Sequence, residues 1–381
     1  MRYEPADLFF IAGEASGDLQ ASLLARAARD MRPGVRMAAV GGDRLRTAGV
    51  PIVYDSSELA SIGPISVLPR IPLLYGILRW LDVVMRRRPS RLLVPVDAGA
   101  FNVRLIKRLR AAGYRGPIVY YFPPGAWLDN PEQARAVGGA ATALTPFAHQ
   151  RDFYRSLGLP IEFFGHPLVS VITQRPPQPL SPTPLIAVLP GSRREEVARH
   201  LGVLAKAARD LRLHLRANYV AVAASDKREK QIRESWARSG GPSDMAISRE
   251  DASTVLARAD LAWAASGTAV LEAALVGVPQ IAFYVVSPAQ YRVAQRRLPK
   301  ELLWAITLPN LVLQRRIVPE LLQHDFTPAR LVEETLKLLD QEMQRDRMRA
   351  DYDELRRALG PPDSLQRITD FVVDRLQAGT T

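Results

Sequence analysis

The sequence predicts an α/β protein with two domains, each built on a parallel β-sheet that helices cover on both faces. Three observations lead to this prediction. The chain has 381 residues, and a domain usually holds about 100–200. Short apolar runs alternate with helix-like segments along most of the chain, which is the pattern of repeated βα units. A proline-rich stretch, Gln174–Pro184, interrupts the alternation and predicts a linker over residues 174–184.

The first half of the chain contains five expected strands. Their apolar runs are continuous rather than alternating, as in strands buried on both faces. These runs are Asp7–Ala12, Arg36–Val40, Arg91–Val96, Pro117–Phe122 and Ile161–Phe164. Leu19–Met31 and Val103–Ala112 are expected helices between them. We therefore expect domain one over residues 1–173.

The same alternation begins again after the linker. Its expected strands are Leu185–Leu189, Tyr219–Ala224, Leu261–Ala265 and Gln280–Tyr284. This predicts domain two over residues 185–360. A long helical stretch follows and is broken at Gly360-Pro361-Pro362. We expect the break to let the last helix, residues 364–381, return to domain one.

Composition excludes several classes of protein. Hydrophobic residues make up 47% and charged residues 24% of the chain, which is typical of globular proteins and not of disordered ones. The absence of cysteine excludes disulfides and thiol nucleophiles. No apolar run is long enough to span a membrane, and the N-terminus does not resemble an export signal. We therefore expect a cytoplasmic protein.

The formal net charge of +12 predicts an anionic partner. Nucleic acid, anionic lipid and phosphorylated small molecules all fit this charge. The sequence has no basic-aromatic array and no zinc-finger spacing, so nucleic acid is not expected. The five histidines do not cluster, so no metal site is expected either.

Loops after the expected strands of domain one carry candidate site residues, because open parallel sheets bind ligands beyond the carboxyl ends of their strands. The first loop, Gly13–Asp18, reads GEASGD and lacks the GxGxxG spacing of dinucleotide sites. Ser16 suits the cap of the following helix, and Glu14 and Asp18 suit the recognition of hydroxyl groups near its positive end. A plain capped turn explains this loop equally well.

Asp97 is the candidate general base. It ends a buried strand, where partial burial raises the pKa of a carboxyl group towards the working pH range. The alternative is that Asp97 caps a helix that begins at Phe101.

Two loops of domain two suit a nucleotide diphosphate. In the first, Gly191 allows a turn, Ser192 is expected to cap a helix near Arg194, and Arg193 adds a cation beside the exposed N–H groups. An ordinary turn explains the glycine and the serine but not an arginine near a positive helix end.

The second of these loops, Ser266-Gly267-Thr268, offers hydroxyl and N–H donors at a helix start. Glu272 lies one turn further along the same helix face and suits both hydroxyls of a ribose. Capping alone would also explain the serine and the threonine.

Val67–Arg88 predicts a helix that lies on an anionic membrane surface. The segment is mostly apolar, carries Trp80, and ends in Arg86, Arg87 and Arg88. The alternative is a buried helix with a basic last turn.

Seven motifs, taken together, carry a family resemblance. They are GEASGD (Gly13–Asp18), GGDRLRTAG (Gly41–Gly49), VDAGAFN (Val96–Asn102), GHPL (Gly165–Leu168), LPGSRREEV (Leu189–Val197), SGTAVLEAAL (Ser266–Leu275) and LPNLVLQRRIVPELLQ (Leu308–Gln323). Their order along nearly the whole chain resembles bacterial lipid-A-disaccharide synthase. The resemblance implies a GT-B fold of two facing Rossmann-like domains. It also implies transfer of a diacylglucosamine unit from its UDP donor to diacylglucosamine 1-phosphate.

The resemblance further implies roles for individual residues. Asp97 would deprotonate the 6-hydroxyl of the acceptor, and the anomeric centre would be inverted. No metal and no cofactor are implied, and the enzyme would work on the cytoplasmic face of the inner membrane. The implied UDP contacts are Ser192, Arg193, Ser266, Gly267, Thr268, Glu272 and Asn310. The implied contacts to the sugars are Glu14, Ser16, Asp18, Asn102 and Trp127.

The chain departs from the family pattern on the acceptor side. The family usually has Ser-Pro-Ser-Val-Trp-Ala-Trp-Arg where this chain has Phe122–Asp129, with Trp127 kept and Leu128 in place of the arginine. Ala148 replaces the glutamate of the family's Pro-Phe-Glu. Two alternatives therefore stay open. One is an enzyme of the same fold with another acceptor, or a nucleotide-sugar epimerase. The other is a non-catalytic, membrane-associated homologue. The oligomeric state is not predicted.

Overall fold

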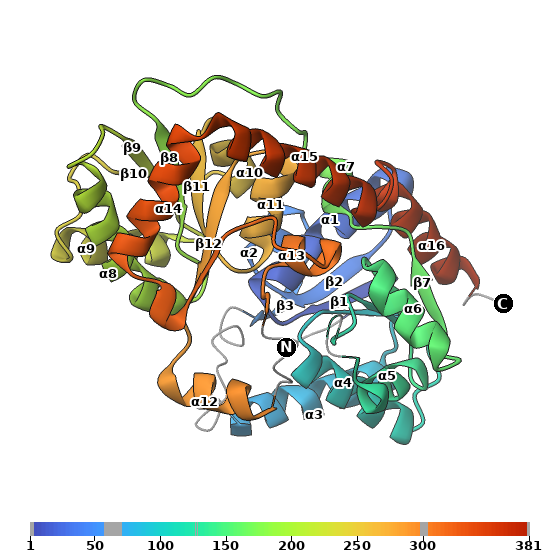
Figure 1. The fold of residues 1–381 in the computed structure, drawn as a ribbon. Helices are drawn as coiled ribbons and strands as arrows, with labels where there is room; N and C mark the ends of the chain where they lie inside the picture. The colour runs from blue at the N-terminus through green and yellow to red at the C-terminus, as the bar shows by residue number, and fades with distance from the viewer. Residues whose placement is uncertain (1–3, 57–70, 126, 128, 298–303, 379–381) are drawn as a thin grey trace. The chain divides into compact units, whose positions relative to one another are not determined.

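The computed structural model describes residues 4–56, 71–125, 127, 129–297 and 304–378 (Figure 1). The chain divides into two compact units, which are Met1–Ser170 together with Leu359–Thr381 (unit 1) and Val171–Ala358 (unit 2). Each unit contains one parallel sheet, of seven strands in unit 1 and six in unit 2. The predicted α/β class with two doubly wound sheets is confirmed.

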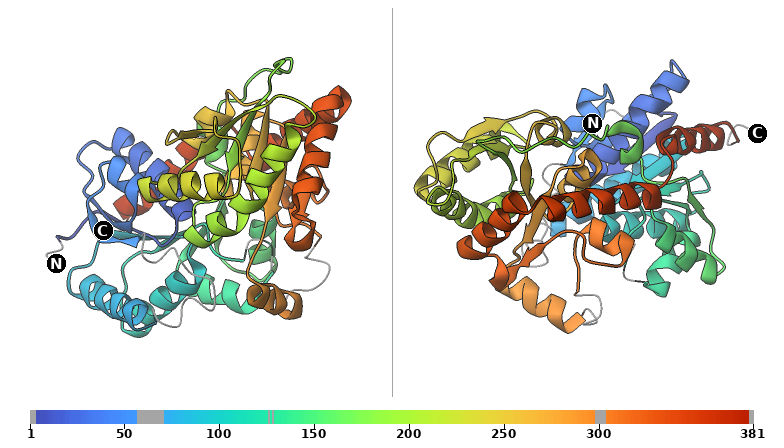
Figure 2. Two further views of the ribbon diagram at one scale, coloured as in Figure 1. Left: turned by 90° about the vertical axis from the view of Figure 1, so that its left-hand side faces the viewer. Right: turned by 45° about the horizontal axis from the view of Figure 1, so that its top comes forward.

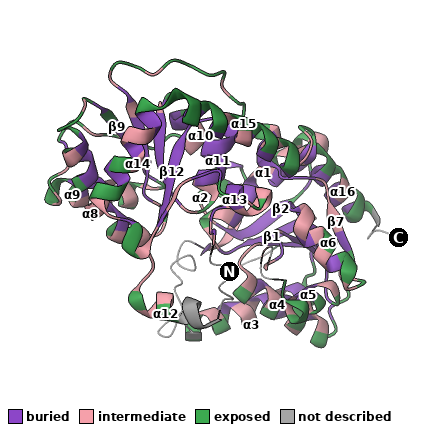
Figure 3. Ribbon diagram, viewed as in Figure 1, coloured by how far each residue is buried: buried purple, intermediate pink, exposed green. Residues whose placement is uncertain are grey.

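The sheet of unit 1 has the strand order β3-β2-β1-β4-β5-β6-β7, and every pair is parallel. Its strands are β1 (Leu8–Ala12), β2 (Met37–Gly41), β3 (Ile52–Asp55), β4 (Leu92–Val96), β5 (Val119–Tyr121), β6 (Thr142–Thr145) and β7 (Ile161–Phe163). The inner strands β1, β2 and β4 are buried along their whole length (Figure 3). This explains their continuous apolar sequence.

Helices cover both faces of this sheet (Figure 2). They are α1 (Ala15–Met31), α2 (Asp43–Thr47), α3 (Ile71–Arg87), α4 (Gly99–Ala111), α5 (Pro131–Gly138), α6 (Ala148–Ser156), α7 (Leu168–Val171) and α16 (Ser364–Ala378). Successive residues of β1 serve opposite faces. Phe9 packs in the core beneath α3 and α4, and Phe10 packs in the core beneath α1 and α16.

The sheet of unit 2 has the order β10-β9-β8-β11-β12-β13, again all parallel. Its strands are β8 (Leu185–Leu189), β9 (Asn218–Val222), β10 (Ala246–Ser248), β11 (Leu261–Ala265), β12 (Gln280–Tyr284) and β13 (Glu320–Leu322). Its helices are α8 (Arg194–Leu211), α9 (Asp226–Arg238), α10 (Ala252–Leu256), α11 (Thr268–Val276), α12 (Pro288–Arg297), α13 (Leu308–Leu313), η4 (Gln323–Asp325), α14 (Pro328–Asp340) and α15 (Glu342–Leu359).

The sequence patterns located nine of the described strands and missed four short ones. All nine expected strands are present, each within two residues at its start and its end. The four unpredicted strands β3, β6, β10 and β13 have only three or four residues each. Residues 172–184 form no helix or strand. The last helix, α16, packs against α1 in unit 1, with Ile368 and Val372 in the same core as Leu24 and Ala28.

Both sheets contain a point where the order of the strands reverses. In unit 1 this point lies between β1 and β4, and Ala12 is in register with Val96. In unit 2 it lies between β8 and β11. Loops after neighbouring parallel strands diverge to opposite faces at such a point and leave room for a ligand. The four loops selected from the sequence follow these four strands.

Candidate functional site

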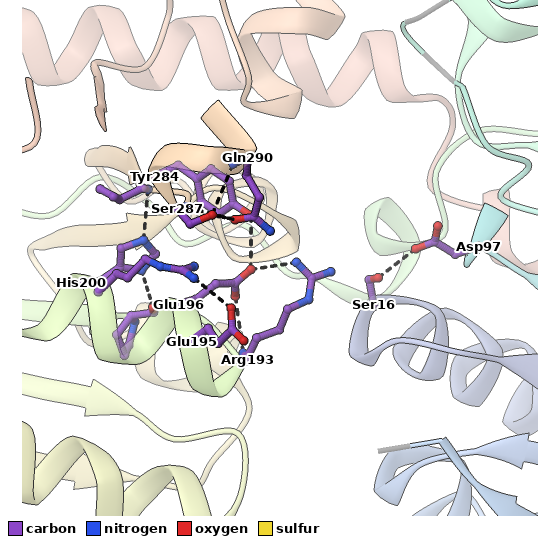
Figure 4. Close-up of polar contacts among 12 residues, drawn as sticks. Ser16, Asp97, Arg193, Glu195, Glu196, His200, Tyr284, Ser287 and Gln290 are labelled. Atoms are coloured by element: carbon purple, nitrogen blue, oxygen red, sulfur yellow. Dashed lines mark hydrogen bonds and ion pairs between the residues drawn. The ribbon is translucent and has the colours of Figure 1, made fainter. Parts of the chain in front are cut away.

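The loops after β1 and β4 meet through a hydrogen bond. Ser16 Oγ donates to Asp97 Oδ2 at 2.9 Å (Figure 4). The backbone between them is also close, since a Cβ on Gly17 would lie 3.1 Å from the carbonyl oxygen of Val96. Gly17, the second glycine of GEASGD, therefore lets the first turn of α1 approach Asp97.

The backbone at the carboxyl ends of β4 and β5 is unusual. Among the described residues, six that are not glycine have a positive φ, and four of them lie in the loops that follow these two strands. They are Asp97 (52°), Ala98 (47°), Phe122 (55°) and Asp129 (33°). This conformation costs about 1–3 kcal/mol for each residue, and such strain gathers at functional sites. It marks this edge of the sheet as the candidate active site.

Two buried side chains hold the strained turn at Asp97. The hydroxyl of Tyr120 donates to the carbonyl oxygen of Asp97 at 2.8 Å, and Asn102 Nδ2 donates to the same oxygen at 2.9 Å. Asn102 Nδ2 also reaches the carbonyl oxygens of Ile11 and Val96 at 3.2 and 3.3 Å. Asn102 is fully buried. Its expected contact with a sugar is therefore corrected, because the amide nitrogen shapes the loop from inside the protein.

Asp18 also differs from its predicted role. Its carboxylate accepts the backbone N–H groups of Gly42 and Arg44 at 2.7 and 2.9 Å, at the start of α2. Only 5% of the residue is exposed, and this burial raises the pKa of its carboxyl group despite those bonds. Asp18 thus joins the loop after β1 to the loop after β2, and its carboxylate is not presented to a sugar.

The expected helix caps in unit 1 are also corrected. The N-cap of α1 is Glu14, and Ser16 lies inside the first turn, where its hydroxyl meets Asp97. The N-cap of α4 is Ala98 rather than Asp97. Helix capping therefore does not explain Asp97. Glu14 is half-buried at the same edge.

Trp127 lies in an aromatic group on the acceptor-side loop. Its ring stacks on His149 with centroids 5.5 Å apart and also contacts Phe147. His149 Nε2 lies 3.0 Å from Asp129 Oδ1. Leu128 lies outside the described residues. Asp129 and His149 were not predicted from the sequence, although both occur where the chain departs from the family pattern.

In unit 2, Arg193 forms a network with Glu196 (Figure 4). Arg193 Nη1 donates to Glu196 Oε1 at 2.7 Å, and the hydroxyl of Tyr284 donates to the same oxygen at 3.3 Å. Arg193 is the N-cap of α8. The expected cap, Ser192, precedes it and is exposed. Glu196 was not predicted from the sequence, although a glutamate at the third helical position is the signature of a capping box.

The loop after β11 starts α11 with an exposed glycine. Gly267 is the N-cap, with φ 146°, and nothing lies within 4 Å of where its Cβ would be. Ser266 Oγ donates to the carbonyl oxygen of Ile306 at 3.3 Å. Thr268 is the first residue of α11, and Glu272 is buried on the same helix, with 8% exposure. An anion can therefore approach the N–H groups at this helix start.

Asn310 is fully engaged inside unit 2. Its Oδ1 accepts the backbone N–H groups of Ile317 and Val318 at 2.7 and 2.9 Å. Its Nδ2 donates to the carbonyl oxygen of Val318 and to Glu320 Oε1 at 2.9 and 2.8 Å. All four hydrogen-bonding positions of the amide are used. The expected contact with UDP is corrected, because Asn310 holds the segment around α13.

Helix α3 is partly a core helix. Ile77, Leu81 and Met85 are buried, and Trp80 packs against the same core. Arg86 donates to the buried Asp82 at 3.0 and 3.1 Å. Trp80 and Arg86 therefore have structural contacts, while Arg86 is also exposed, and their expected membrane roles stay predictions. Leu73, Tyr75, Arg87 and Arg88 are exposed.

The predicted surface segment extends beyond the described part of α3, since residues 67–70 lie outside it. Within the described residues, no helix is both long enough and apolar enough to cross a membrane.

Comparison with known proteins identifies the family. The family model described as "Lipid-A-disaccharide synthetase" matches residues 8–367. The chain belongs to this family. A lipid-A-disaccharide synthase of Myxococcus xanthus is 32% identical over 390 residues, covering 98% of this chain and 99% of that protein. The enzyme of the same name from Thiobacillus denitrificans is 34% identical, covering 92% of this chain and 94% of that protein. The predicted family is confirmed, and with it glycosyltransferase activity in lipid A synthesis.

Solved structures agree with the fold of the lipid-A-disaccharide synthetase family. A UDP-N-acetylglucosamine 2-epimerase described as putative, from Listeria monocytogenes, has a TM-score of 0.65 at 14% identity, covering 97% of this chain and 95% of that one. The calicheamicin glycosyltransferase CalG4 has a TM-score of 0.59 at 18% identity, covering 99% of each chain. At these identities the likeness concerns the fold alone.

Proposed function

We propose that the protein transfers a diacylglucosamine unit from its UDP donor to diacylglucosamine 1-phosphate, which forms the lipid A disaccharide and releases UDP. The observation that carries the proposal is Asp97. Its carboxylate lies at the switch point of unit 1, on a strained turn, with Ser16 bound to one oxygen. A fixed carboxylate at this position suits a general base.

The proposed reaction is a single displacement. Asp97 takes the proton of the acceptor's 6-hydroxyl while that oxygen forms a bond to the anomeric carbon of the donor. The bond from this carbon to the diphosphate breaks, and UDP leaves with the electron pair. Attack from the side opposite the leaving group inverts the anomeric centre.

Unit 2 supplies the proposed UDP site. Arg193 and the N–H groups at the starts of α8 and α11 are suited to stabilise the charge that develops on the diphosphate. Glu272, on α11, is proposed to accept the ribose hydroxyls. Ser192, Ser266, Gly267 and Thr268 are the remaining proposed contacts. The proposal includes no metal ion and no cofactor.

The proposed acceptor side lies in unit 1. Glu14 and Trp127 are the proposed sugar contacts, and Ser16 orients the base. We also propose that the start of α3 contacts an anionic membrane on its cytoplasmic face, because Leu73 and Tyr75 are exposed apolar side chains on a helix with an exposed basic end. A surface enzyme of this kind can draw acylated sugars from the bilayer.

A mass-spectrometric assay tests the proposal. The purified protein is incubated with the UDP-diacylglucosamine donor and with diacylglucosamine 1-phosphate, and a parallel sample omits the acceptor. We expect disaccharide and UDP only in the complete mixture. UDP or an epimerised donor without disaccharide would instead support another acceptor or an epimerase, and an unchanged mixture would support a non-catalytic homologue.

A further inference from the structure

Glu196 is a mostly buried anion that holds a partly exposed cation. Its Oε1 accepts from Arg193 Nη1 at 2.7 Å and from the hydroxyl of Tyr284 at 3.3 Å. Its Oε2 accepts the backbone N–H of Arg193 at 3.4 Å. The side chain of Glu196 is 12% exposed and that of Arg193 is 37% exposed. The carboxylate therefore holds the arginine from the protein side, and the arginine side chain stays partly exposed.

His200 fixes the other end of the same loop. It lies one helical turn after Glu196 on α8, and its Nδ1 is 2.8 Å from the carbonyl oxygen of Pro190. Its Nε2 accepts the backbone N–H of Val285 at 3.2 Å. Burial lowers the pKa of His200, so the ring is neutral, with Nδ1–H as the donor. The loop Pro190–Arg193 is thus tied at both ends to the end of β12.

The end of β12 also holds the second loop of the switch point. The backbone N–H of Ser266 donates to the carbonyl oxygen of Phe283 at 2.9 Å. Residues 283–285 therefore anchor both loops that we propose to bind the diphosphate. The side chain of Tyr284 contributes to this anchoring through its hydrogen bond to Glu196.

Helix capping alone does not explain the network. A glutamate at the third helical position can accept the N-cap N–H group whatever the N-cap side chain is. An arginine at a helix N-terminus is electrostatically unfavourable unless an anion offsets it. Glu196 supplies this anion within the protein and fixes the guanidinium near the N–H groups of the helix start.

We infer that Glu196 is a positioning residue that holds the guanidinium of Arg193 ready for the donor's diphosphate, and that Tyr284 orients Glu196. The inference rests on the proposed UDP site. Arginine loses rotamer freedom when it binds a phosphate, and a side chain that is already held loses less. An arginine held in this way therefore binds the diphosphate more tightly than an unrestrained arginine would.

Glu196→Gln tests the inference directly. The variant keeps the size of the side chain and an oxygen for Tyr284, but it removes the charge that holds Arg193. We expect the Kd for UDP, measured by calorimetry, to rise about tenfold, the change typical of losing one charge-assisted hydrogen bond. The Kd for uridine, which has no phosphate, should stay unchanged. Tyr284→Phe should raise the Kd for UDP about two- to threefold, because its bond to Glu196 is longer.

Glu195→Gln is the matched control. Glu195 is the neighbouring residue in the same helical turn and pairs with Arg199 at 2.8 Å. Its substitution makes the same change in charge at the same helix start. We expect the Kd for UDP to stay within about twofold of wild type, because a surface charge contributes little.

A double variant separates action through Arg193 from direct contact. Arg193→Ala alone should weaken UDP binding. Adding Glu196→Gln to Arg193→Ala should then cause no further loss, because the group that Glu196 positions is gone. Thermal melting of each variant checks that the protein is folded.

Four results would overturn the inference. They are an unchanged Kd for UDP in Glu196→Gln, a tighter Kd, an equal loss of uridine and UDP binding, and a loss that adds fully to that of Arg193→Ala. Disaccharide formation by the wild-type protein is measured separately, so failure of the proposed reaction remains distinguishable from failure of this inference.

Discussion

Ser16 Oγ lies 2.9 Å from Asp97 Oδ2, although the two residues are 81 positions apart in the chain. The bond joins the first turn of α1 to the end of β4, across the point where the strand order reverses. Ser16 can donate only one hydrogen bond, and it donates it to one carboxylate oxygen. This arrangement orients the carboxylate of Asp97.

The first prediction concerns Asp97→Asn. The variant keeps the volume and an oxygen that can accept from Ser16, but it removes the proton acceptor. We expect the fold and UDP affinity to persist while turnover falls about 10²–10⁴-fold. Ser16→Ala keeps the base but removes the hydrogen bond that orients it, so turnover should fall only about tenfold. Turnover is measured as disaccharide formed per minute. Near-normal turnover of Asp97→Asn would place the base elsewhere, with Glu14 the next candidate.

The second prediction concerns the nucleotide contacts in unit 2. Arg193→Ala and Glu272→Ala should each weaken UDP binding by about 1–3 kcal/mol, the usual cost of losing a charged hydrogen-bond partner. Asn310→Ala is the contrasting variant, because its four internal bonds predict lower thermal stability rather than a direct loss of ligand contacts. Calorimetry and thermal melting are measured on all three variants. Unchanged UDP affinity in both Arg193→Ala and Glu272→Ala would contradict the proposed site.

The third prediction separates membrane contact from structure in α3. Changing Arg87 and Arg88 together to Ser should reduce cosedimentation with anionic vesicles, because each arginine near such a surface contributes about 1 kcal/mol. Arg86→Ser should instead lower stability by about 1 kcal/mol, because it removes one of two arginine partners of the buried Asp82. Equal vesicle binding by wild type and the Arg87/Arg88 variant would contradict the membrane proposal.

The fourth prediction concerns acid stability. His166 is buried beside Phe122 and Phe147, and burial lowers its pKa from 6.5 to about 3. The unfolded chain binds a proton below pH 6.5, but the folded protein does not until about pH 3. The contribution of His166 to the free energy of unfolding is therefore fully present above pH 6.5 and is lost as the pH falls towards 3. From pH 7.5 to 5 the loss is about 2 kcal/mol.

Urea unfolding at pH 7.5 and pH 5 tests the fourth prediction. His166→Phe keeps an aromatic ring but cannot bind a proton, so its stability should fall about 2 kcal/mol less than that of wild type over this range. His200 is present in both proteins, so its own titration cancels in the comparison. An equal loss in both proteins would show that His166 is not the group responsible.

The sequence by itself determined the long buried strands and the loops that follow them. β8, β11 and β12 begin and end at the predicted residues, because a strand covered on both faces must be continuously apolar. The resemblance carried by the motifs also predicted the family correctly. Strands β6 (TALT) and β13 (ELL) were missed, because polar residues leave them without the longer continuous apolar run that predicted the equally short β5.

Only the tertiary structure decided what each polar side chain in those loops does. Asp18, Asn102 and Asn310 occur in recognisable motifs, yet each is bonded to backbone groups inside its own unit. Glu196 was not singled out from the sequence, and Tyr284, 88 residues further on, provides one of its hydrogen bonds. The physical reason is that a buried polar group loses its hydrogen bonds to water. Its role then depends on which protein groups lie close enough to replace them. Parallel strand order brings those partners together from positions far apart in the chain.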